Sequence, residues 1–203
     1  MKNILFEKKF TQGIYRVYDE SPENVIHLKQ VHGNRVFNRE TIKDKKNLSV
    51  EGDGINCYWQ DFMQSTTPLI AIKTADCLPI VVIGKKGFSI LHAGWKGVQQ
   101  KILLAPEVAL LNPEIIFIGP SIQPTSFEVT EEFKNYFPQS KNFLQKEDKL
   151  FFHLQNEIFD QAKYHYPSCE LVDSQIDTLT NNHLRSFRRS KTATLSNWNI
   201  FEL

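Results

Sequence analysis

Three short segments of the chain place a chemically reactive side chain at or near the end of an apolar run. In "LKQVHGNRV", "IKTADCLPI" and "ILHAGWKGV" these side chains are His32, Cys77 and His92. Glycine or proline stands close to each of them, so we expect the chain to turn there and to present the side chain at a strand end. Two imidazoles and one thiolate form a ligand set known from catalytic zinc sites, in which water or substrate takes the fourth position.

The same residue types permit other interpretations. The separations along the chain, 77 − 32 = 45 and 92 − 77 = 15, match no local zinc-finger or HExxH spacing. His92 can instead activate Cys77 as a nucleophile, as in cysteine hydrolases. A lone cysteine is often a small buried hydrophobe, and a lone histidine is often a hydrogen-bonded residue without a chemical role. The residue types alone leave these alternatives open.

The segments that must position these side chains are rich in β-branched residues. Five apolar runs predict strands: "NVIHL", "LIAI", "LPIVVIG", "FSILHA" and "EIIFIG". Helical spacing of apolar residues appears over 98–105, where Pro106 interrupts it, and again over 154–162. The segment "TEEFKNYF" also predicts a helix, with Thr130 as its N-cap. Strands and helices interleave without strict alternation, which favours a mixed-sheet α/β or α+β domain over a doubly wound parallel sheet.

The composition is that of an ordinary globular protein. The 203 residues are 41% hydrophobic and 23% charged with a net charge of +1, which gives no support to nucleic-acid binding. No apolar run reaches the roughly 18 residues of a membrane helix, and the N-terminus lacks a signal-peptide core. Three widely spaced cysteines, Cys57, Cys77 and Cys169, favour free thiols in a reducing compartment, so we expect a cytoplasmic protein. The polar stretch over 40–54 predicts a surface loop.

Five motifs, taken together and in order, carry a resemblance to a known family. The segments "QVHG", "TADCLPI", "HAGWKG", "GPSI" and "FEV" resemble the YfiH-like family, also called the polyphenol oxidase or laccase-domain family, over roughly residues 28 to 189. The resemblance implies that His32, Cys77 and His92 bind zinc. It implies phosphorolysis of adenosine, inosine or methylthioadenosine and deamination of adenosine, with copper-dependent phenol oxidation as an older alternative. It also implies a single domain over 1–203, built of packed mixed sheets with outer helices.

The chain departs from the family pattern at both ends of the matching region. The S-T-R-x-G-G segment that usually precedes the "QVHG" motif is absent, so we expect a shortened N-terminal part. Near the C-terminus Asp177 stands where the family has cysteine, but "SFRR" survives and makes Arg188 and Arg189 the matching positions. Two guanidinium groups suit phosphate, although a solvated basic run is an equal alternative. Asp53 in "GDGI" is expected to orient a ligand histidine or to contact substrate, unless it serves only an Asx turn.

Four functional hypotheses follow. The first is a zinc enzyme that acts on a purine nucleoside and phosphate, with no nucleic acid or membrane partner. The second is a copper-dependent phenol oxidase, which is disfavoured because the chain has six histidines and no HxH pair. The third is a metal-free Cys/His hydrolase. The fourth is a zinc-binding protein without catalytic activity.

Overall fold

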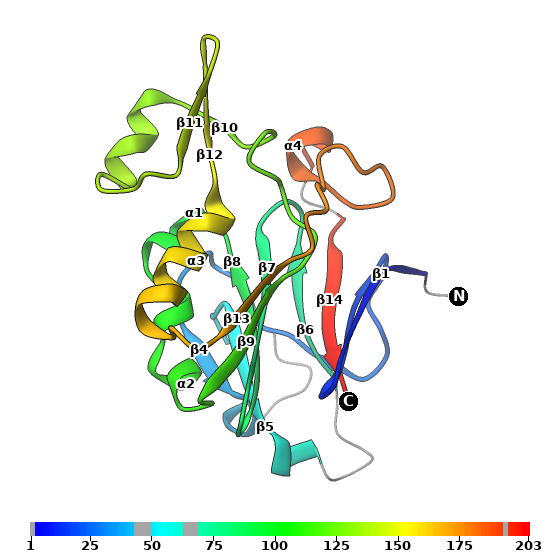
Figure 1. The fold of residues 1–203 in the computed structure, drawn as a ribbon. Coiled ribbons are helices and arrows are strands. Elements are labelled where there is room, and N and C mark those ends of the chain that lie inside the picture. Colours follow the sequence, from blue (N-terminus) through cyan, green and yellow to red (C-terminus); the bar gives the residue numbers. More distant parts are fainter. Residues whose placement is uncertain (1–2, 43–49, 63–68, 193–194) are drawn as a thin grey trace.

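The computed structural model describes residues 3–42, 50–62, 69–192 and 195–203, which form two large mixed sheets, one small sheet and outer helices (Figure 1). In chain order the strands are β1 (Ile4–Phe10), β2 (Gly13–Tyr18), β3 (Val25–Ile26), β4 (Val36–Asn38), β5 (Gly54–Tyr58), β6 (Leu69–Thr74), β7 (Leu78–Gly84), β8 (Gly87–Ala93), β9 (Pro113–Ile118), β10 (Glu128–Val129), β11 (Phe143–Lys146), β12 (Lys149–Phe152), β13 (Glu170–Asp173) and β14 (Asn197–Glu202). The α-helices are α1 (Trp95–Gln99), α2 (Pro106–Ala109), α3 (Leu154–His165) and α4 (Phe187–Ser190). Short 3₁₀ helices cover Arg39–Thr41, Trp59–Phe62, Ile102–Leu104 and Glu131–Tyr136.

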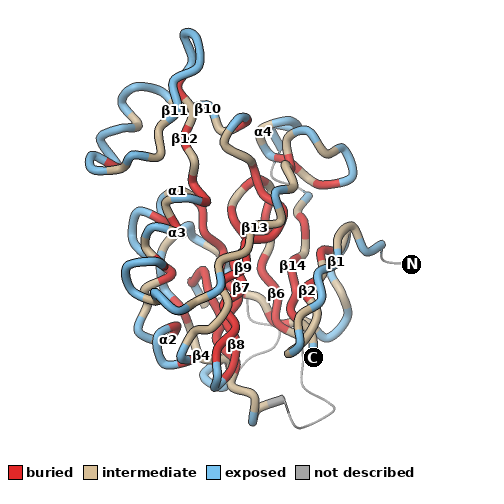
Figure 2. Tube along the Cα trace, in the orientation of Figure 1, coloured by how far each residue is buried: buried red, intermediate tan, exposed pale blue. Residues whose placement is uncertain are grey.

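The six-stranded sheet, in the order β13-β9-β7-β8-β5-β4, is the centre of the molecule. Its strands β7 and β8 are buried along their whole length, as Figure 2 shows. Alternate side chains of β7 face two different cores: Ile80 and Val82 lie in one, and Val81 and Ile83 lie in the other. A strand covered on both faces needs apolar residues at every position, which explains the unbroken run "LPIVVIG".

Helices cover one face of this sheet, and a second sheet covers the other. The first core joins the sheet to α1, α2 and α3. The second core joins it to the five-stranded sheet, which has the order β1-β2-β14-β6-β3. Strand β14 therefore lies between β2 and β6, although it comes last in the sequence, and it brings the C-terminus to the same side as the N-terminus (Figure 1). The expected mixed α/β fold of packed sheets with outer helices is confirmed.

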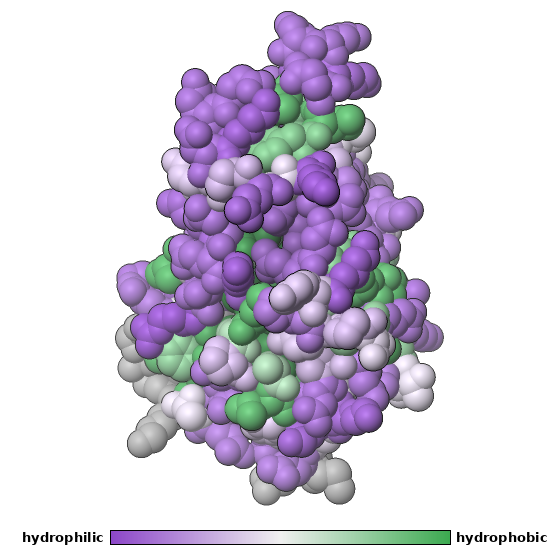
Figure 3. Space-filling model, turned by 60° about the vertical axis from the view of Figure 1, so that its left-hand side comes forward, coloured by the Kyte–Doolittle hydropathy of each residue, from purple (hydrophilic) through white to green (hydrophobic). Residues whose placement is uncertain are grey.

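A small sheet of order β10-β12-β11 extends beyond this body, and its hairpin projects into solvent (Figure 1). Aromatic rings fill its base, where the ring of Phe152 lies 4.7 Å from that of Phe137 and 4.6 Å from that of Phe143. Phe127 packs on the same cluster. The face drawn in Figure 3 is largely hydrophilic, with apolar surface confined to patches.

The predicted strands are all present, and the helix over 154–162 is confirmed as α3. A single helix over 98–105 is wrong, because Lys101 adopts a left-handed conformation with φ of 60° that separates α1 from the next 3₁₀ turn. Pro106, expected to interrupt that helix, occupies the first turn of α2. The segment after Thr130 is a 3₁₀ helix, and the Thr130 side chain makes no capping hydrogen bond.

The expected surface loop over 40–54 is only partly found. Residues 43–49 lie outside the described residues, and Glu51 is exposed, but Gly52, Asp53 and Gly54 are buried. Burial follows because Asp53 reaches beneath the turn that carries His32. Within the described ranges, no helix is long and apolar enough to cross a membrane.

Candidate metal centre

The structure brings His32, Cys77 and His92 together from three separate parts of the chain. His32 lies in the loop between β3 and β4, Cys77 in the turn between β6 and β7, and His92 near the end of β8. One ligand atom from each lies within 4.8 Å of the others, and the two imidazole rings are 4.7 Å apart at 79°. Zinc bonds to nitrogen and sulfur are about 2.0–2.3 Å long, so small side-chain adjustments bring these atoms onto one ion.

Asp53 holds both histidines of this cluster. Its Oδ1 lies 2.8 Å from Nδ1 of His92, which donates to it, so that Nε2 is the nitrogen available to a metal once it has given up its proton. Such a carboxylate–histidine pair fixes the tautomer and the orientation of a metal ligand. This hydrogen bond is the contact through which Asp53 would orient a ligand histidine, a role that stays a prediction. With 0% exposure, Asp53 lies behind His92 and not at a pocket wall.

The same carboxylate shapes the turn around His32. It accepts backbone N–H bonds from Val31 (3.3 Å), His32 (3.0 Å) and Gly33 (2.7 Å). His32 itself adopts a left-handed conformation with φ of 59°, which is uncommon for a residue with a Cβ. Burial opposes ionisation of Asp53, but the bonds from His92, Gly33 and His32 keep its pKa below the ordinary value. The anionic carboxylate thus stabilises the strained turn.

The Cys77 side chain favours the thiolate. Burial alone would raise its pKa, but the positive charge of His92 and hydrogen bonding with His32 and His92 lower that pKa to about 6. For His92, burial lowers the pKa, whereas Cys77 and Asp53 together raise it to about 9. A thiolate is the form that binds metal and the form that attacks electrophiles. The electrostatics therefore suit both a zinc ligand and a nucleophile.

Asp76 shapes the turn of Cys77 and does not join the cluster. Its φ of 93° shows that the chain turns at this residue. One carboxylate oxygen accepts from Oγ1 of Thr178 (2.7 Å) and the other from the backbone N–H of Arg188 (2.7 Å). Asp76 thus ties the Cys77 turn to α4.

Gly94 packs directly against two of the three ligands. A Cβ at this position would lie 3.1 Å from Sγ of Cys77 and 3.1 Å from Cδ2 of His32. Its backbone, with φ of −68° and ψ of 169°, needs no glycine for conformational reasons. The glycine of "HAGW" is therefore explained by space beside the ligands.

The other two cysteines lie apart from this centre. Cys57 is fully buried in the second core, and burial raises the pKa of its thiol. Cys169 donates to the carbonyl of Pro113 at 3.0 Å. All three cysteines are free, which agrees with the expectation that a disulfide framework is absent. Within the described part of the chain, His32, Cys77 and His92 are the group suited to hold a metal.

Two pockets meet at Cys77. The lysine pocket, of about 650 Å³, is lined by Leu28, Lys29, Gln30, His32, Lys73, Ala75, Cys77, His92, Phe187, Leu195 and Ser196. The aromatic pocket, of about 330 Å³, is lined by Ala75, Asp76, Cys77, Gly94, Trp95, Ile122, Phe127, Leu154, Phe187, Arg188 and Lys191. Ala75, Cys77 and Phe187 belong to both, so the cluster has open space beside it.

The two arginines of "SFRR" are placed differently. Arg188 lines the aromatic pocket, where its guanidinium lies 5.3 Å from the ring centre of Phe127 and donates to the carbonyl of Glu128. The guanidinium of Arg189 instead donates to four loop carbonyls, those of Thr178, Leu179, Asn181 and Leu184. Arg189 lines neither pocket, because these bonds hold it against its own loop.

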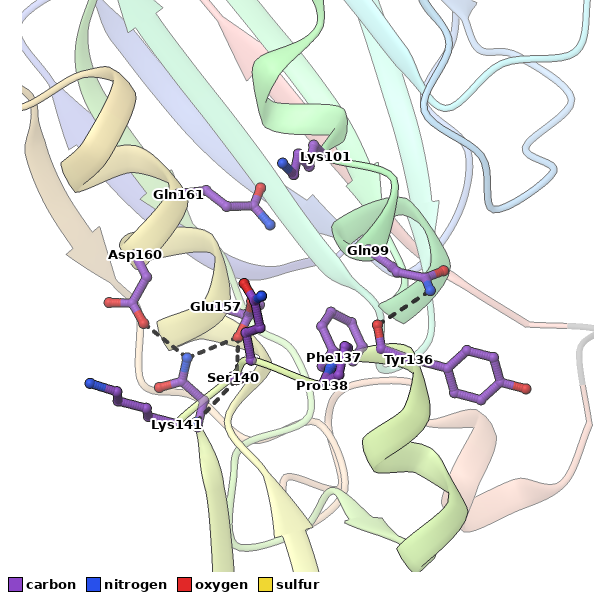
Figure 4. A pocket seen from close by; sticks show the side chains of 12 residues that line it. Gln99, Lys101, Tyr136, Phe137, Pro138, Ser140, Lys141, Glu157, Asp160 and Gln161 are labelled. Atoms are coloured by element: carbon purple, nitrogen blue, oxygen red, sulfur yellow. Dashed lines mark hydrogen bonds between the residues drawn. The ribbon is translucent and has the colours of Figure 1, made fainter.

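A third cleft, of about 610 Å³, lies between α3 and the segment after the 3₁₀ helix Glu131–Tyr136 (Figure 4). Its polar groups largely satisfy one another. Asn142 donates to Glu157 (2.9 Å) and to Asp160 (3.0 Å), and Ser140 donates to Glu157 (2.6 Å). None of the three ligands lines this cleft, so it is separate from the candidate metal centre.

Two residues of the lysine pocket stand outside the family motifs. Lys73 lies beside Gln30, the first residue of "QVHG", and Leu195 lies at the edge of the pocket from a segment far away in the sequence. Lys73 is a single charged residue at the end of the apolar run "LIAIKT", and this position is the only feature of the sequence that could have marked it as a site residue. Phe187 and Leu195 are exposed apolar side chains beside the centre.

Comparison with known proteins identifies the family. A family model described as multi-copper polyphenol oxidoreductase laccase matches residues 11–198. The chain belongs to this family. A purine nucleoside phosphorylase of Aquifex aeolicus is 31% identical over 154 residues, which are 73% of this chain and 70% of the relative. The purine nucleoside phosphorylase YfiH of Escherichia coli is 29% identical over 187 residues, 84% of this chain and 71% of the relative. The resemblance to YfiH-like proteins is thereby confirmed.

Solved structures agree on the fold. The Neisseria meningitidis protein NMB0706 superposes with a TM-score of 0.72 at 21% identity, covering 88% of this chain and 74% of that one. YlmD from Geobacillus stearothermophilus gives a TM-score of 0.73 at 21% identity, covering 89% and 73%. At this identity the likeness concerns the fold alone.

Proposed function

We propose that this protein is a zinc-dependent enzyme that acts on purine nucleosides, cleaving adenosine, inosine or methylthioadenosine with phosphate and deaminating adenosine. The observation that carries the proposal is the cluster of His32, Cys77 and His92 with open pockets beside it. Three ligands with an adjoining pocket are typical of catalytic zinc, whereas structural zinc has four protein ligands. Relatives named purine nucleoside phosphorylase support the choice of substrate.

The donor set fits zinc in its chemistry as well as its spacing. The thiolate of Cys77 is the protonation state that zinc requires, and His92 would release its Nε2 proton on binding the metal while Asp53 keeps the proton on Nδ1. The chemistry that zinc supplies when bound here is Lewis acidity, which stabilises negative charge that develops on the reacting groups. His32, which is exposed to solvent, would complete the ligand set.

In the proposed phosphorolysis, an oxygen of hydrogen phosphate forms a bond to C1′ of the ribose while the bond between C1′ and N9 of the purine breaks. The bonding electrons leave with the purine, and the proton that phosphate gives up is the one that the free base gains. Arg188 contacts the substrate from the aromatic pocket, Asp53 supports His92 from behind, and Arg189 holds the loop that carries Thr178. In the deamination, water replaces the exocyclic amine, which leaves as ammonia.

A metal-free Cys/His hydrolase is the second candidate. The pKa of Cys77 is lowered to about 6 and that of His92 is raised to about 9, which is the electrostatic pattern of a thiolate–imidazolium pair. A copper phenol oxidase receives less support. Multi-copper chemistry needs several metal sites, and the described residues offer one suitable cluster. We place the enzyme in the cytoplasm, where its three free thiols would persist, with no nucleic-acid partner.

The test combines metal analysis with turnover. Protein purified without added metal should contain about one zinc per chain, and Cys77→Ala, His32→Ala and His92→Ala should each lose it. The wild type should convert adenosine, inosine or methylthioadenosine, with release of the free base dependent on phosphate. Full activity after removal of metal by a chelator would favour the Cys/His hydrolase. Zinc without turnover of any of the three nucleosides would overturn the proposed function.

Replacing the two other cysteines separates a catalytic zinc from a structural one. Cys57→Ser and Cys169→Ser should leave the zinc content unchanged, because both thiols lie outside the cluster. The matched change Cys77→Ser should remove the metal. Loss of zinc from either control variant would mean a fourth protein ligand and a closed structural site.

A further inference from the structure

The two pockets that meet at Cys77 differ in the chemistry of their walls. We propose that the lysine pocket binds the phosphate and that Lys73 is its phosphate-binding residue, while the aromatic pocket binds the purine. This inference rests on the proposed function and assigns its two substrates to two places. The residues that both pockets share, Ala75, Cys77 and Phe187, then lie beside the ribose.

Lys73 is held in a fixed position at the end of β6. The side chain of Gln30 donates to the carbonyl of Lys73 (2.7 Å) and accepts from its N–H (2.7 Å). Its Nζ lies 5.5 Å from the ring centre of Trp198, the residue opposite it on β14. Gln30 stands two residues before His32 in the sequence, so the same loop sets both the metal ligand and the lysine. The Gln30 bonds fix the backbone from which the lysine extends, and the Trp198 ring is the contact made by the ammonium group itself.

Lys73 also has its charge available. The other lysine of this pocket, Lys29, is paired with Glu51 at 2.8 Å. Among the residues that the structure describes, Lys73 forms no ion pair with a carboxylate. A partly buried cation without a counter-ion attracts a diffusible anion. Phosphate, the co-substrate of the proposed reaction, is an anion small enough to enter this pocket of about 650 Å³.

The aromatic pocket suits the purine. Trp95, Phe127 and Phe187 contribute rings to its wall, and Ile122 and Leu154 add apolar side chains, whereas Asp76, Arg188 and Lys191 supply its charged groups. Flat heteroaromatic bases stack on such side chains. Arg188 is present, but its guanidinium already lies over Phe127 and donates to the Glu128 carbonyl. We therefore assign Arg188 to the edge of the base and not to phosphate.

The reaction itself favours two separate pockets. The phosphate oxygen approaches C1′ from the side opposite to the bond that breaks, so phosphate and base must occupy different spaces on either side of the ribose. The leaving base takes the electron pair of the C1′–N9 bond and gains the proton that phosphate loses. Two pockets that adjoin along Cys77 provide this arrangement.

The decisive experiment compares Lys73→Met and Arg188→Met in steady-state phosphorolysis. In Lys73→Met the KM for phosphate should rise about tenfold or more, with the KM for nucleoside changed less than about twofold, because one charge-assisted contact is lost. In Arg188→Met the KM for nucleoside should rise while that for phosphate changes little. Lys163→Met, which alters an exposed lysine of α3 outside both pockets, serves as the matched control.

A binding measurement makes the test independent of turnover. Titration of the wild type with inorganic phosphate, followed by ³¹P NMR, should give saturable binding that Lys73→Met weakens about tenfold and Lys163→Met leaves unchanged. Equal phosphate binding by the wild type and Lys73→Met would overturn the assignment, as would a rise in the KM for phosphate confined to Arg188→Met. Absence of nucleoside turnover with Lys73-dependent phosphate binding would instead refute the proposed function while leaving the anion site standing.

Discussion

At the scale of single residues, Asp53 positions both histidines of the candidate centre. Its carboxylate bonds to the imidazole ring of His92 and to the backbone N–H of His32. Asp53→Asn should therefore lower zinc affinity by about 10–100-fold, because an amide nitrogen would face the N–H groups that the carboxylate now accepts. Competition with a chromophoric chelator measures this affinity. Asp160→Asn, an exposed change on α3, is the control, and equal affinities of the two variants would contradict the role of Asp53.

The chemistry of Cys77 gives a prediction for pH. Its pKa is lowered from an ordinary value near 9 to about 6, so the thiolate is present above pH 6 and is lost as the pH falls through that value. In protein stripped of metal, the rate of alkylation of Cys77 by iodoacetamide should reach half its maximum near pH 6. Buried Cys57, whose pKa is raised, should stay unmodified. Peptide mass spectrometry distinguishes the sites, and a midpoint near pH 9 for Cys77 would contradict the proposed charge pairing.

At the scale of elements, the turn from β8 into α1 sets the space beside the ligands. Gly94→Ala places a methyl group about 3.1 Å from both Cys77 and His32, closer than ordinary contacts allow. The ligands must move, so zinc affinity should fall by about tenfold or more, whereas the backbone accepts alanine without strain. The thermal midpoint of the metal-free protein should change by less than about 3 °C. A large drop in that midpoint with unchanged zinc affinity would show a structural role.

The elements that the sequence predicted are those with local signals. Strands β7 and β8 could be predicted because burial on both faces requires an unbroken run of apolar residues. Helix α3 could be predicted because burial of one face places apolar residues at helical spacing. Exposed strands such as β1, which carries Glu7, Lys8 and Lys9, leave no such pattern and were missed. The break at Lys101 was also missed, since its left-handed conformation has no glycine to mark it.

The clustering of three candidate ligands was predictable, but their surroundings were less so. The motifs named His32, Cys77 and His92, and the structure brings them together. Spacing could not show that Arg189 bonds to its own loop while Arg188 reaches a pocket, because neighbouring side chains diverge from one short helix. Nor could it place Lys73 beside His32, since that proximity depends on Gln30 bridging two segments 43 residues apart.

At the scale of the whole molecule, the central sheet belongs to both cores. Ile80 lies in the core against the helices and Ile83 in the core between the sheets, so either change to alanine should lower the free energy of unfolding by about 2–5 kcal/mol.

Because β7 and β8 contribute side chains to both cores, the two cores should unfold together. Fluorinated Trp59 and Trp95 report on the two cores separately by ¹⁹F NMR during urea unfolding. Distinct midpoints for the two signals would contradict a single cooperative unit.

The position of β14 bears on the order in which the protein is completed during synthesis. All three residues of the candidate metal centre have been made by residue 92, long before the strand that joins β2 to β6. Until β14 is made, the β1–β2 pair and the β6–β3 pair have no strand to connect them. Leu195 and Ser196, which edge the lysine pocket, and Trp198, on which Lys73 rests, are made in the same final stretch. A nascent chain on the ribosome therefore possesses its metal-binding groups well before it possesses a finished pocket in which to use them.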